Sequence, residues 1–133
     1  MLRLEIVTPE KKVLDANVDS VTIPTASGEA GILPNHAPLI SALKPGILSY
    51  STKGTIERLA IAGGFVEVSS DKVAILTDTA ESGSEIDAES ARAEREAAEK
   101  ALAGQSASAL EDTEVERERL EAANARLQLV TGK

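Results

Sequence analysis

The chain has no cysteine, no tryptophan, one phenylalanine, one tyrosine and one histidine in 133 residues. Without cysteine there is no disulfide framework and no thiolate chemistry, which agrees with a reducing compartment. So few aromatic rings leave little for base stacking, and the core has to be built from Val, Ile, Leu and Ala. Long apolar runs are also missing, and the first residues lack the apolar segment of a signal peptide. We therefore expect a soluble chain that reaches any membrane only through other proteins.

Positive charge is scarce relative to negative charge. The chain has 14 Lys and Arg against 22 Asp and Glu, a formal net charge of −8, and no basic cluster is interleaved with aromatic residues. Nucleic-acid binding and binding to anionic lipid both need basic surfaces that neutralise phosphate. The composition therefore argues against nucleic-acid binding and against direct insertion into or binding to a membrane.

Motifs for enzyme chemistry are missing as well. The sequence contains no H-E-x-x-H, no G-x-x-x-x-G-K-[ST] and no G-x-S-x-G. A Ser–His–Asp site or a metal site would have to recruit His36, which lies in a segment crowded by Pro34 and Pro38. A neutral imidazole offers one hydrogen-bond donor and one acceptor, so an interface histidine is favoured over a catalytic one. We expect no catalytic residue, no metal site and no activity of the chain by itself.

Residues 1–84 alternate apolar and polar positions, with turn residues every few positions. The alternation begins at Leu2–Ile6, and the last apolar run is Val73-Ala74-Ile75-Leu76. We expect turns at Asp15-Ala16-Asn17 and at Lys53-Gly54, and no helical period separates the strands. The pattern predicts an antiparallel β-sandwich or flattened barrel of about ten short strands.

In residues 85–133, Ala, Glu and Arg dominate and β-branched residues become rare. Asp87 is typical of a helix N-cap and Gly104 of a C-cap. A second helix should begin around 109–113 and end near Val130. The fold class is therefore mixed, β then α, with a sandwich domain over 1–84 and an antiparallel two-helix hairpin over 85–133.

Alanine dominates the apolar positions of the predicted hairpin. The apolar stripe of the second helix consists of Val115, Leu120, Ala123, Leu127 and Val130. Burial of apolar surface stabilises by roughly 25 cal/mol per Å². Each alanine buries little area, so the hairpin should dock weakly on the sandwich. Two interpretations stay open, a movable arm and a permanently docked helical pair.

The segment Gly28–Leu39, with Leu43-Lys44-Pro45-Gly46 after it, concentrates residues that constrain the backbone. It contains three of the five prolines and the only histidine. Glycine admits positive φ and proline fixes φ near −65°, so the chain itself sets the shape of such a loop. A rigid, mostly uncharged loop on a β-scaffold is suited to holding a partner. The alternative is a tight corner between two strands.

Four motifs follow one another along the first two thirds of the chain. They are Val7-Thr8-Pro9-Glu10, the segment Gly28–Gly46, Ala62-Gly63-Gly64-Phe65-Val66-Glu67-Val68 and Val73-Ala74-Ile75-Leu76-Thr77-Asp78-Thr79-Ala80. In this order and spacing they resemble the epsilon subunit of bacterial-type F-type ATP synthases, called delta in mitochondria. The last third is similar in its helical layout more than in its residues.

The resemblance implies a non-catalytic rotor subunit that links the gamma subunit to the ring of c subunits in a proton-translocating ATP synthase. It assigns a c-ring contact to Gly28, Glu29, Ala30 and Gly31, and a gamma contact to Pro34, Asn35 and His36. Such a subunit would lie at the cytoplasmic face of the bacterial plasma membrane, held there peripherally by the complex.

The resemblance also implies a regulatory role for the hairpin. In bacterial members the hairpin can extend along gamma into the alpha/beta catalytic head and inhibit ATP hydrolysis. Basic residues are thought to engage an acidic segment of beta, and here they would be Arg92, Arg95, Lys100, Arg117, Arg119 and Arg126.

Some bacterial members bind ATP between sandwich and hairpin through a motif of the form Ile/Leu-Asp-x-x-Arg-Ala. This chain has Ile86-Asp87-Ala88-Glu89-Ser90-Ala91, so serine replaces the arginine whose fork recognises phosphate. Two further basic positions of those members fall on Ala97 and Ala122, while Arg126 remains. The degenerate site would consist of Ile86, Asp87, Ala91 and Arg126. We expect ATP to be at most a weak regulatory ligand, and no other cofactor.

Three functions follow from these patterns. The leading one is the non-catalytic rotor subunit that couples and regulates an ATP synthase. The second is an ATP-sensing module in which nucleotide holds the hairpin on the sandwich. The third is a free-standing adaptor of sandwich and hairpin that is unrelated to the synthase.

Overall fold

Apolar and polar side chains alternate along the first strand. Leu2, Leu4 and Ile6 are buried, whereas Arg3 and Glu5 lie on the opposite face. A strand places successive side chains on opposite faces, so this pattern gives one apolar and one polar face. The computed structural model describes residues 2–35, 37–104 and 110–131, with the backbone alone at 104, 110–114 and 131.

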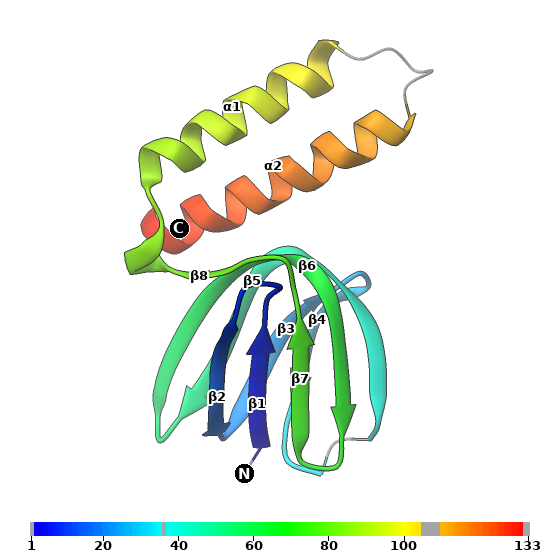
Figure 1. Cartoon of the computed structure of the whole chain (residues 1–133), viewed down its shortest axis with the longest axis vertical. Coiled ribbons are helices and arrows are strands. Elements are labelled where there is room, and N and C mark those ends of the chain that lie inside the picture. The colour runs from blue at the N-terminus through cyan, green and yellow to red at the C-terminus, as the bar shows by residue number, and fades with distance from the viewer. Residues whose placement is uncertain (1, 36, 105–109, 132–133) are drawn as a thin grey trace.

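Strands occupy the first part of the chain and helices the second, as predicted (Figure 1). The strands are β1 (Leu2–Val7), β2 (Lys12–Val18), β3 (Ser20–Thr25), β4 (Gly28–Ile32), β5 (Leu39–Thr52), β6 (Thr55–Ser69), β7 (Lys72–Leu76) and β8 (Ala80–Ser82). A 3-10 turn, η1 (Gly83–Glu85), leads to the helices α1 (Ala88–Gly104) and α2 (Leu110–Thr131).

The strands are hydrogen-bonded in the order β2-β1-β7-β6-β5-β3-β4, and β8 pairs with β6. Two details of the prediction are wrong. Within the described ranges the chain has 8 strands rather than about ten, and the path from β2 to β4 is not closed into a barrel. Moreover, β1 runs parallel to β7, while the other pairs are antiparallel.

The lower strand count has a physical cause in β5 and β6, which remain paired from Leu39↔Val68 to Thr52↔Thr55. Proline and glycine often interrupt strands, but Pro45 in β5 and Gly63-Gly64 in β6 form bends inside continuous strands. The second half of β6 pairs with β7, and its first half pairs with β8. The β5–β6 ribbon therefore arches from one layer of the sandwich to the other.

One apolar core fills the space between the layers. It is aliphatic, as the scarcity of aromatic residues predicts. The largest fully buried side chains are Leu2, Leu4, Ile6, Ile23, Ile32, Leu48, Ile61, Ile75, Val18, Val21, Val66 and Val68.

Two local predictions in the sandwich are also wrong. The expected turn at Asp15–Asn17 lies inside β2, because these residues pair with β1 and Asp15 accepts two hydrogen bonds from Arg3. Pairing with a neighbouring strand outweighs local turn preference. The segment Gly28–Ile32, expected in a rigid loop, is instead an edge strand whose partner is β3.

The hairpin follows the prediction closely. The carboxylate of Asp87 accepts the backbone N–H of Glu89 at 3.0 Å, so Asp87 is the N-cap of α1. The expected turn after Gly104 lies outside the described residues. Ala123 and Leu127 are buried as predicted and Leu120 is half-buried, whereas Val115 and Val130 are exposed.

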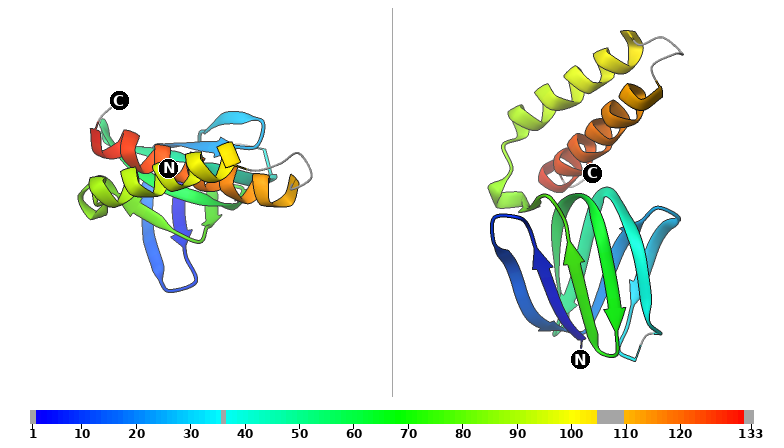
Figure 2. Two further views of the ribbon diagram at one scale, coloured as in Figure 1. Left: turned by 90° about the horizontal axis from the view of Figure 1, so that it is seen from above. Right: turned by 45° about the vertical axis from the view of Figure 1, so that its right-hand side comes forward.

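The hairpin rests on the arch of the sandwich through α2 (Figures 1 and 2). There a second apolar cluster forms, separate from the main core. It contains Ala60, Ile86, Ala91, Ala125 and Leu127, with Ile47 and Leu129 packed against it. We call this cluster the hairpin seat. It is small and rich in alanine, as expected for weak docking.

The bend at Gly64 gives a test of the arch. A Cβ added at Gly64 would lie 1.9 Å from the carbonyl oxygen of Leu76, and φ is +121°. We expect Gly64→Ala to lower the free energy of unfolding by about 2 kcal/mol or more, because the cost of a positive φ in alanine and the cost of the clash with the backbone are additive.

Gly31→Ala is the matched control for this variant. Its added Cβ would meet nothing within 4 Å, so the change should stay within about 0.5 kcal/mol. Urea unfolding of both variants measures the difference. Equal stability of the two variants would show that the bend tolerates a side chain.

Candidate functional site

The two contact sets predicted from the sequence lie at different ends of the sandwich. Strand β4 runs from Gly28, near α2, to Ile32, and the segment Pro34–Asn35 follows at the end away from the helices (Figure 1). A strand of this length spans roughly 15 Å at about 3.3 Å per residue. The fold therefore does not join the predicted c-ring and gamma contacts into one site.

Glu29 is exposed on the edge strand β4, beside the docked hairpin. A groove of about 910 Å³ separates this part of the sandwich from α2. Its lining is mostly polar and includes Glu29, Lys44, Arg58 and Glu121. Ala30 and Gly31 belong to the same strand, but of the four residues in the predicted c-ring contact only Glu29 and Gly31 are exposed, whereas Ala30 packs against the main core.

The predicted gamma segment is fixed to the sandwich at the opposite end. Asn35 has a left-handed backbone with φ of +66°, and its N–H donates to the carboxylate of Asp71 at 2.9 Å. The carbonyl of Asp71 in turn accepts the N–H of Arg3 at 2.7 Å. Pro34 is exposed. His36 lies outside the described residues.

An exposed apolar surface adjoins this segment, and the sequence analysis did not identify it. It consists of Ile40, Ala42, Phe65 and Leu76 on the outer side of β5, β6 and β7, and we call it the outer apolar face. Strand pairing places Phe65 between Ala42 and Leu76. Ile40 is 76%, Phe65 61% and Leu76 57% exposed, although side chains of this kind are usually buried.

Charged side chains border the outer apolar face, with Glu67 on β6 opposite Ile40 and further charged residues on the neighbouring strands. Arg3 pairs with Asp15 at 2.9 Å and Lys72 with Glu5 at 3.5 Å. The hydrogen bonds from Arg3 hold the pKa of Asp15 below its ordinary value. An apolar centre with a charged rim is the usual anatomy of a protein–protein interface.

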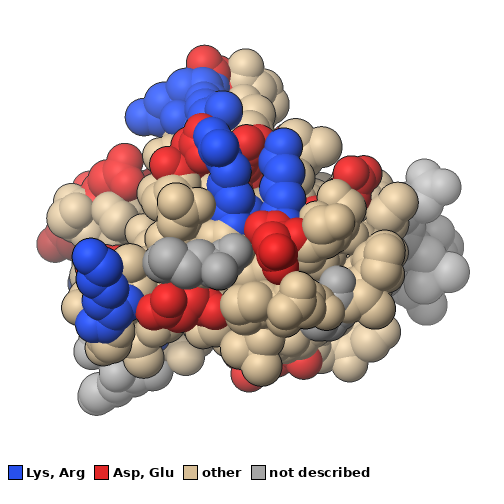
Figure 3. Space-filling model, turned by 90° about the horizontal axis from the view of Figure 1, so that it is seen from below, with Lys and Arg blue, Asp and Glu red and all other residues tan. Residues whose placement is uncertain are grey.

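Figure 3 views the sandwich from the end away from the helices. Basic and acidic side chains lie next to one another on this surface, and neither sign dominates it. A nucleic acid needs a continuous basic surface. The mixed charge on this end therefore favours a protein partner.

Most basic residues of the hairpin lie on its surface. Arg92, Lys100, Arg117 and Arg119 are exposed. Arg95 lies 3.4 Å from Glu99, and Arg119 lies 3.2 Å from Glu116, each on its own helix.

Arg126 differs from the other basic residues of the hairpin, because its side chain is only 17% exposed and contacts two other elements. Its Nη1 pairs with Glu94 of α1 at 2.6 Å. Its Nε lies 3.1 Å from Glu81 of β8, an ion pair in which the N–H is not aligned on the oxygen.

The residues of the degenerate ATP motif meet at this junction. Ile86 and Ala91 are buried in the hairpin seat, Asp87 caps α1, and Arg126 on α2 pairs with Glu94 of α1. The link from β8 to α1 is fixed by Glu85, whose carboxylate accepts the N–H and the hydroxyl of Ser82. These hydrogen bonds hold the pKa of Glu85 below its ordinary value.

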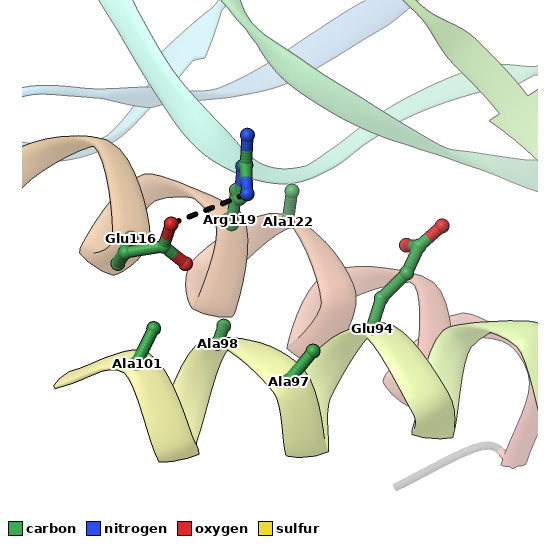
Figure 4. Close-up of a pocket in the computed structure, with 7 residues that line it drawn as sticks. All are labelled: Glu94, Ala97, Ala98, Ala101, Glu116, Arg119 and Ala122. Carbon is green, nitrogen blue, oxygen red and sulfur yellow. Dashed lines mark hydrogen bonds and ion pairs between the residues drawn. The ribbon is translucent and has the colours of Figure 1, made fainter. Parts of the chain in front are cut away.

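A separate cavity of about 480 Å³ lies between α1 and α2 (Figure 4). Four alanines line it, together with Glu94, Glu116 and Arg119. Ala97 and Ala122, the positions expected to be basic in ATP-binding members, are two of these alanines. Their methyl groups cannot bind phosphate.

Within the described ranges, no group of three or more His, Cys, Asp or Glu residues is placed to hold a metal ion. In the same part of the chain, no helix is both long and apolar enough to cross a membrane.

Comparison with known proteins decides the family. Residues 1–83 match the family described as ATP synthase, Delta/Epsilon chain, beta-sandwich domain. The chain belongs to this ATP synthase delta/epsilon family. The family assignment confirms the resemblance seen in the four motifs, and a member of this family is a non-catalytic component of ATP synthase.

Similar members of the delta/epsilon family come from several bacteria. The ATP synthase epsilon chain of Desulfitobacterium hafniense (strain Y51) is 50% identical over 99 residues, which cover 74% of this chain and 75% of that protein. The ATP synthase epsilon chain of Carboxydothermus hydrogenoformans is 49% identical over 102 residues, or 77% of this chain and 76% of that protein.

A solved structure is similar over nearly the whole chain. It is a chain in the cryo-EM structure of the Euglena gracilis mitochondrial ATP synthase, OSCP/F1/c-ring. The TM-score is 0.80 at 29% identity, with 95% of this chain and 81% of that chain covered. The similarity includes both the sandwich and the helices.

Proposed function

We propose that this chain is the epsilon-type subunit of the central stalk of a proton-translocating ATP synthase, where it joins gamma to the c-ring. The family assignment and the similarity to a chain of an assembled synthase support this role. The observation that carries it is the outer apolar face, which exposes three large apolar side chains on one layer of the sandwich.

Gamma is the partner that we assign to the outer apolar face. Ile40 stands near the start of β5, a few residues after Pro34 and Asn35, which the resemblance assigns to gamma. In this proposal Pro34, Asn35 and the outer apolar face bind gamma, and the c-ring contact is on the separate edge strand β4. A subunit that joins two partners needs two such separate surfaces.

The complex would hold the chain at the cytoplasmic face of the bacterial plasma membrane. We further propose that the hairpin regulates ATP hydrolysis through its exposed basic residues and the alpha/beta head. ATP itself is at most a weak ligand, because Ser90, Ala97 and Ala122 supply no charge for phosphate.

The gamma contact is tested by placing a charge on the outer apolar face. Phe65→Lys should weaken binding of purified gamma by about tenfold or more, since an ammonium would be buried at the centre of an apolar interface. Ile56→Lys is the matched control, because Ile56 is 60% exposed on the first half of β6, away from this face. Titration calorimetry measures both. Unchanged gamma binding by folded Phe65→Lys would remove the outer apolar face from the interface.

The c-ring contact is tested at Glu29. In the assembled enzyme, Glu29→Arg should reduce ATP-driven proton pumping relative to ATP hydrolysis, because the reversed charge disturbs the coupling surface. Glu10→Arg, also exposed but in the turn between β1 and β2, should leave the ratio unchanged. Both are measured in vesicles with a pH-sensitive dye. A normal ratio for Glu29→Arg would contradict the ring assignment.

The domain division is tested by a chain that ends at Ser84. It should unfold cooperatively and bind gamma, because the main core contains no residue beyond Ile75 and is only bordered by Ala80. In the assembled complex it should raise ATP hydrolysis by removing the inhibitory hairpin. Urea unfolding, calorimetry with gamma and an ATPase assay check the three outcomes. Loss of cooperative unfolding would show that the helices belong to the core.

A further inference from the structure

Arg126 joins the hairpin to the rest of the fold through ion pairs. Its guanidinium lies between Glu81 on β8 and Glu94 on α1, at 3.1 and 2.6 Å. One side chain of α2 thus contacts both the sandwich and the other helix. The planar fork of arginine suits two carboxylates at once.

Other hairpin ion pairs have a different geometry. Arg95–Glu99 and Arg119–Glu116 join residues three or four positions apart on one helix, and Arg119 is 68% exposed. Such pairs contribute little to stability, because water screens them. The pairs of Arg126 connect residues far apart in sequence, and the arginine is largely withdrawn from water.

The apolar part of the docking surface is small enough for this charge contact to matter. Ile86 and Leu127 are the largest buried side chains of the hairpin seat, and three of its five buried members are alanines. Glu81 is 29% exposed and Glu94 is 55% exposed, so the pair with Glu81 is the more sheltered of the two. Removing one partner from a sheltered ion pair leaves an uncompensated charge, which costs far more than an exposed pair contributes.

We propose that Arg126, Glu81 and Glu94 form an ionic latch that holds the hairpin on the sandwich without nucleotide. The two carboxylates neutralise the charge of the arginine from within the chain, so no phosphate is needed for docking. While the latch is closed, the guanidinium of Arg126 is paired with Glu81 and Glu94 and is not available to an acidic segment of a partner. Its effect on ATP hydrolysis rests on the proposed function, but the latch itself is a property of the isolated chain.

The two carboxylates have separable roles. Glu81 belongs to the sandwich side, so its pair with Arg126 opposes undocking. Glu94 belongs to α1, so its pair opposes separation of the two helices. Neutralising Glu81 should therefore release the hairpin as a unit, whereas neutralising Glu94 should loosen the contact between α1 and α2.

The latch is tested by measuring hairpin position in the isolated full-length chain. Because the sequence has no cysteine, Glu57→Cys on β6 and Glu96→Cys on α1 allow two spin labels to be placed on exposed sites. Pulsed electron resonance then reports the docked and undocked populations as a distance distribution.

Arg126→Gln and Glu81→Gln should each reduce the ratio of docked to undocked chains by about tenfold or more, given a sheltered but not fully buried pair. Arg126→Lys should give an intermediate ratio, because an ammonium keeps the charge but not the fork. Arg119→Gln, on the same helix with a partner one turn away, is the control and should not change the ratio. Millimolar ATP should leave the wild-type ratio unchanged.

A wild-type ratio for Arg126→Gln, in a chain with native circular dichroism, would overturn the latch. A clear shift toward docking on addition of ATP would also overturn it, since docking would then depend on nucleotide. If the latch variants undock as expected but ATP hydrolysis in the complex does not change, the latch stands and the proposed regulation fails.

Discussion

The pairing of β5 with β6 is the interaction on which the other features depend. The two strands stay in register from Leu39↔Val68 to Thr52↔Thr55 while they bend over Pro45 and Gly63-Gly64. One half of the ribbon carries Phe65 and Ala42 on the outer apolar face. The other half places Ile47 opposite Ala60, and these two residues support α2. A single bent ribbon therefore positions both the proposed partner surface and the base of the hairpin.

Much of the fold could be predicted from the sequence because its patterns are local. The alternation of apolar and polar residues predicted the buried face of β1, and Asp87 predicted the start of α1. The strand count failed where Pro45 and the glycine pair bend a strand without ending it. Edge strand β4 was mistaken for a loop because Gly28 and Gly31 weaken the strand pattern, while pairing with β3 holds them extended.

One of the candidate sites could also have been predicted from the sequence, and another could not. The exposure of Phe65 could have been predicted, since Val66 and Val68 occupy the inward positions of the same strand. The cluster of Glu81, Glu94 and Arg126 could not, because Arg126 and Glu94 are 32 positions apart and only the antiparallel hairpin brings them together. Hairpin docking combines a small apolar cluster with a sheltered charge contact. The relative contributions of the apolar cluster and of the charge contact to docking depend on tertiary geometry, which cannot be predicted from residue spacing.

An open sheet leaves two edges, and β4 is one of them. Free strand edges can template pairing with another chain, which leads to aggregation. Strand β4 has five residues, two of them glycines, and directs the carboxylate of Glu29 outward. Such a strand is too short, too flexible and too charged to recruit a second strand readily. The glycines that made β4 resemble a loop, together with Glu29, therefore also disfavour self-association of the chain through this edge when no partner covers it.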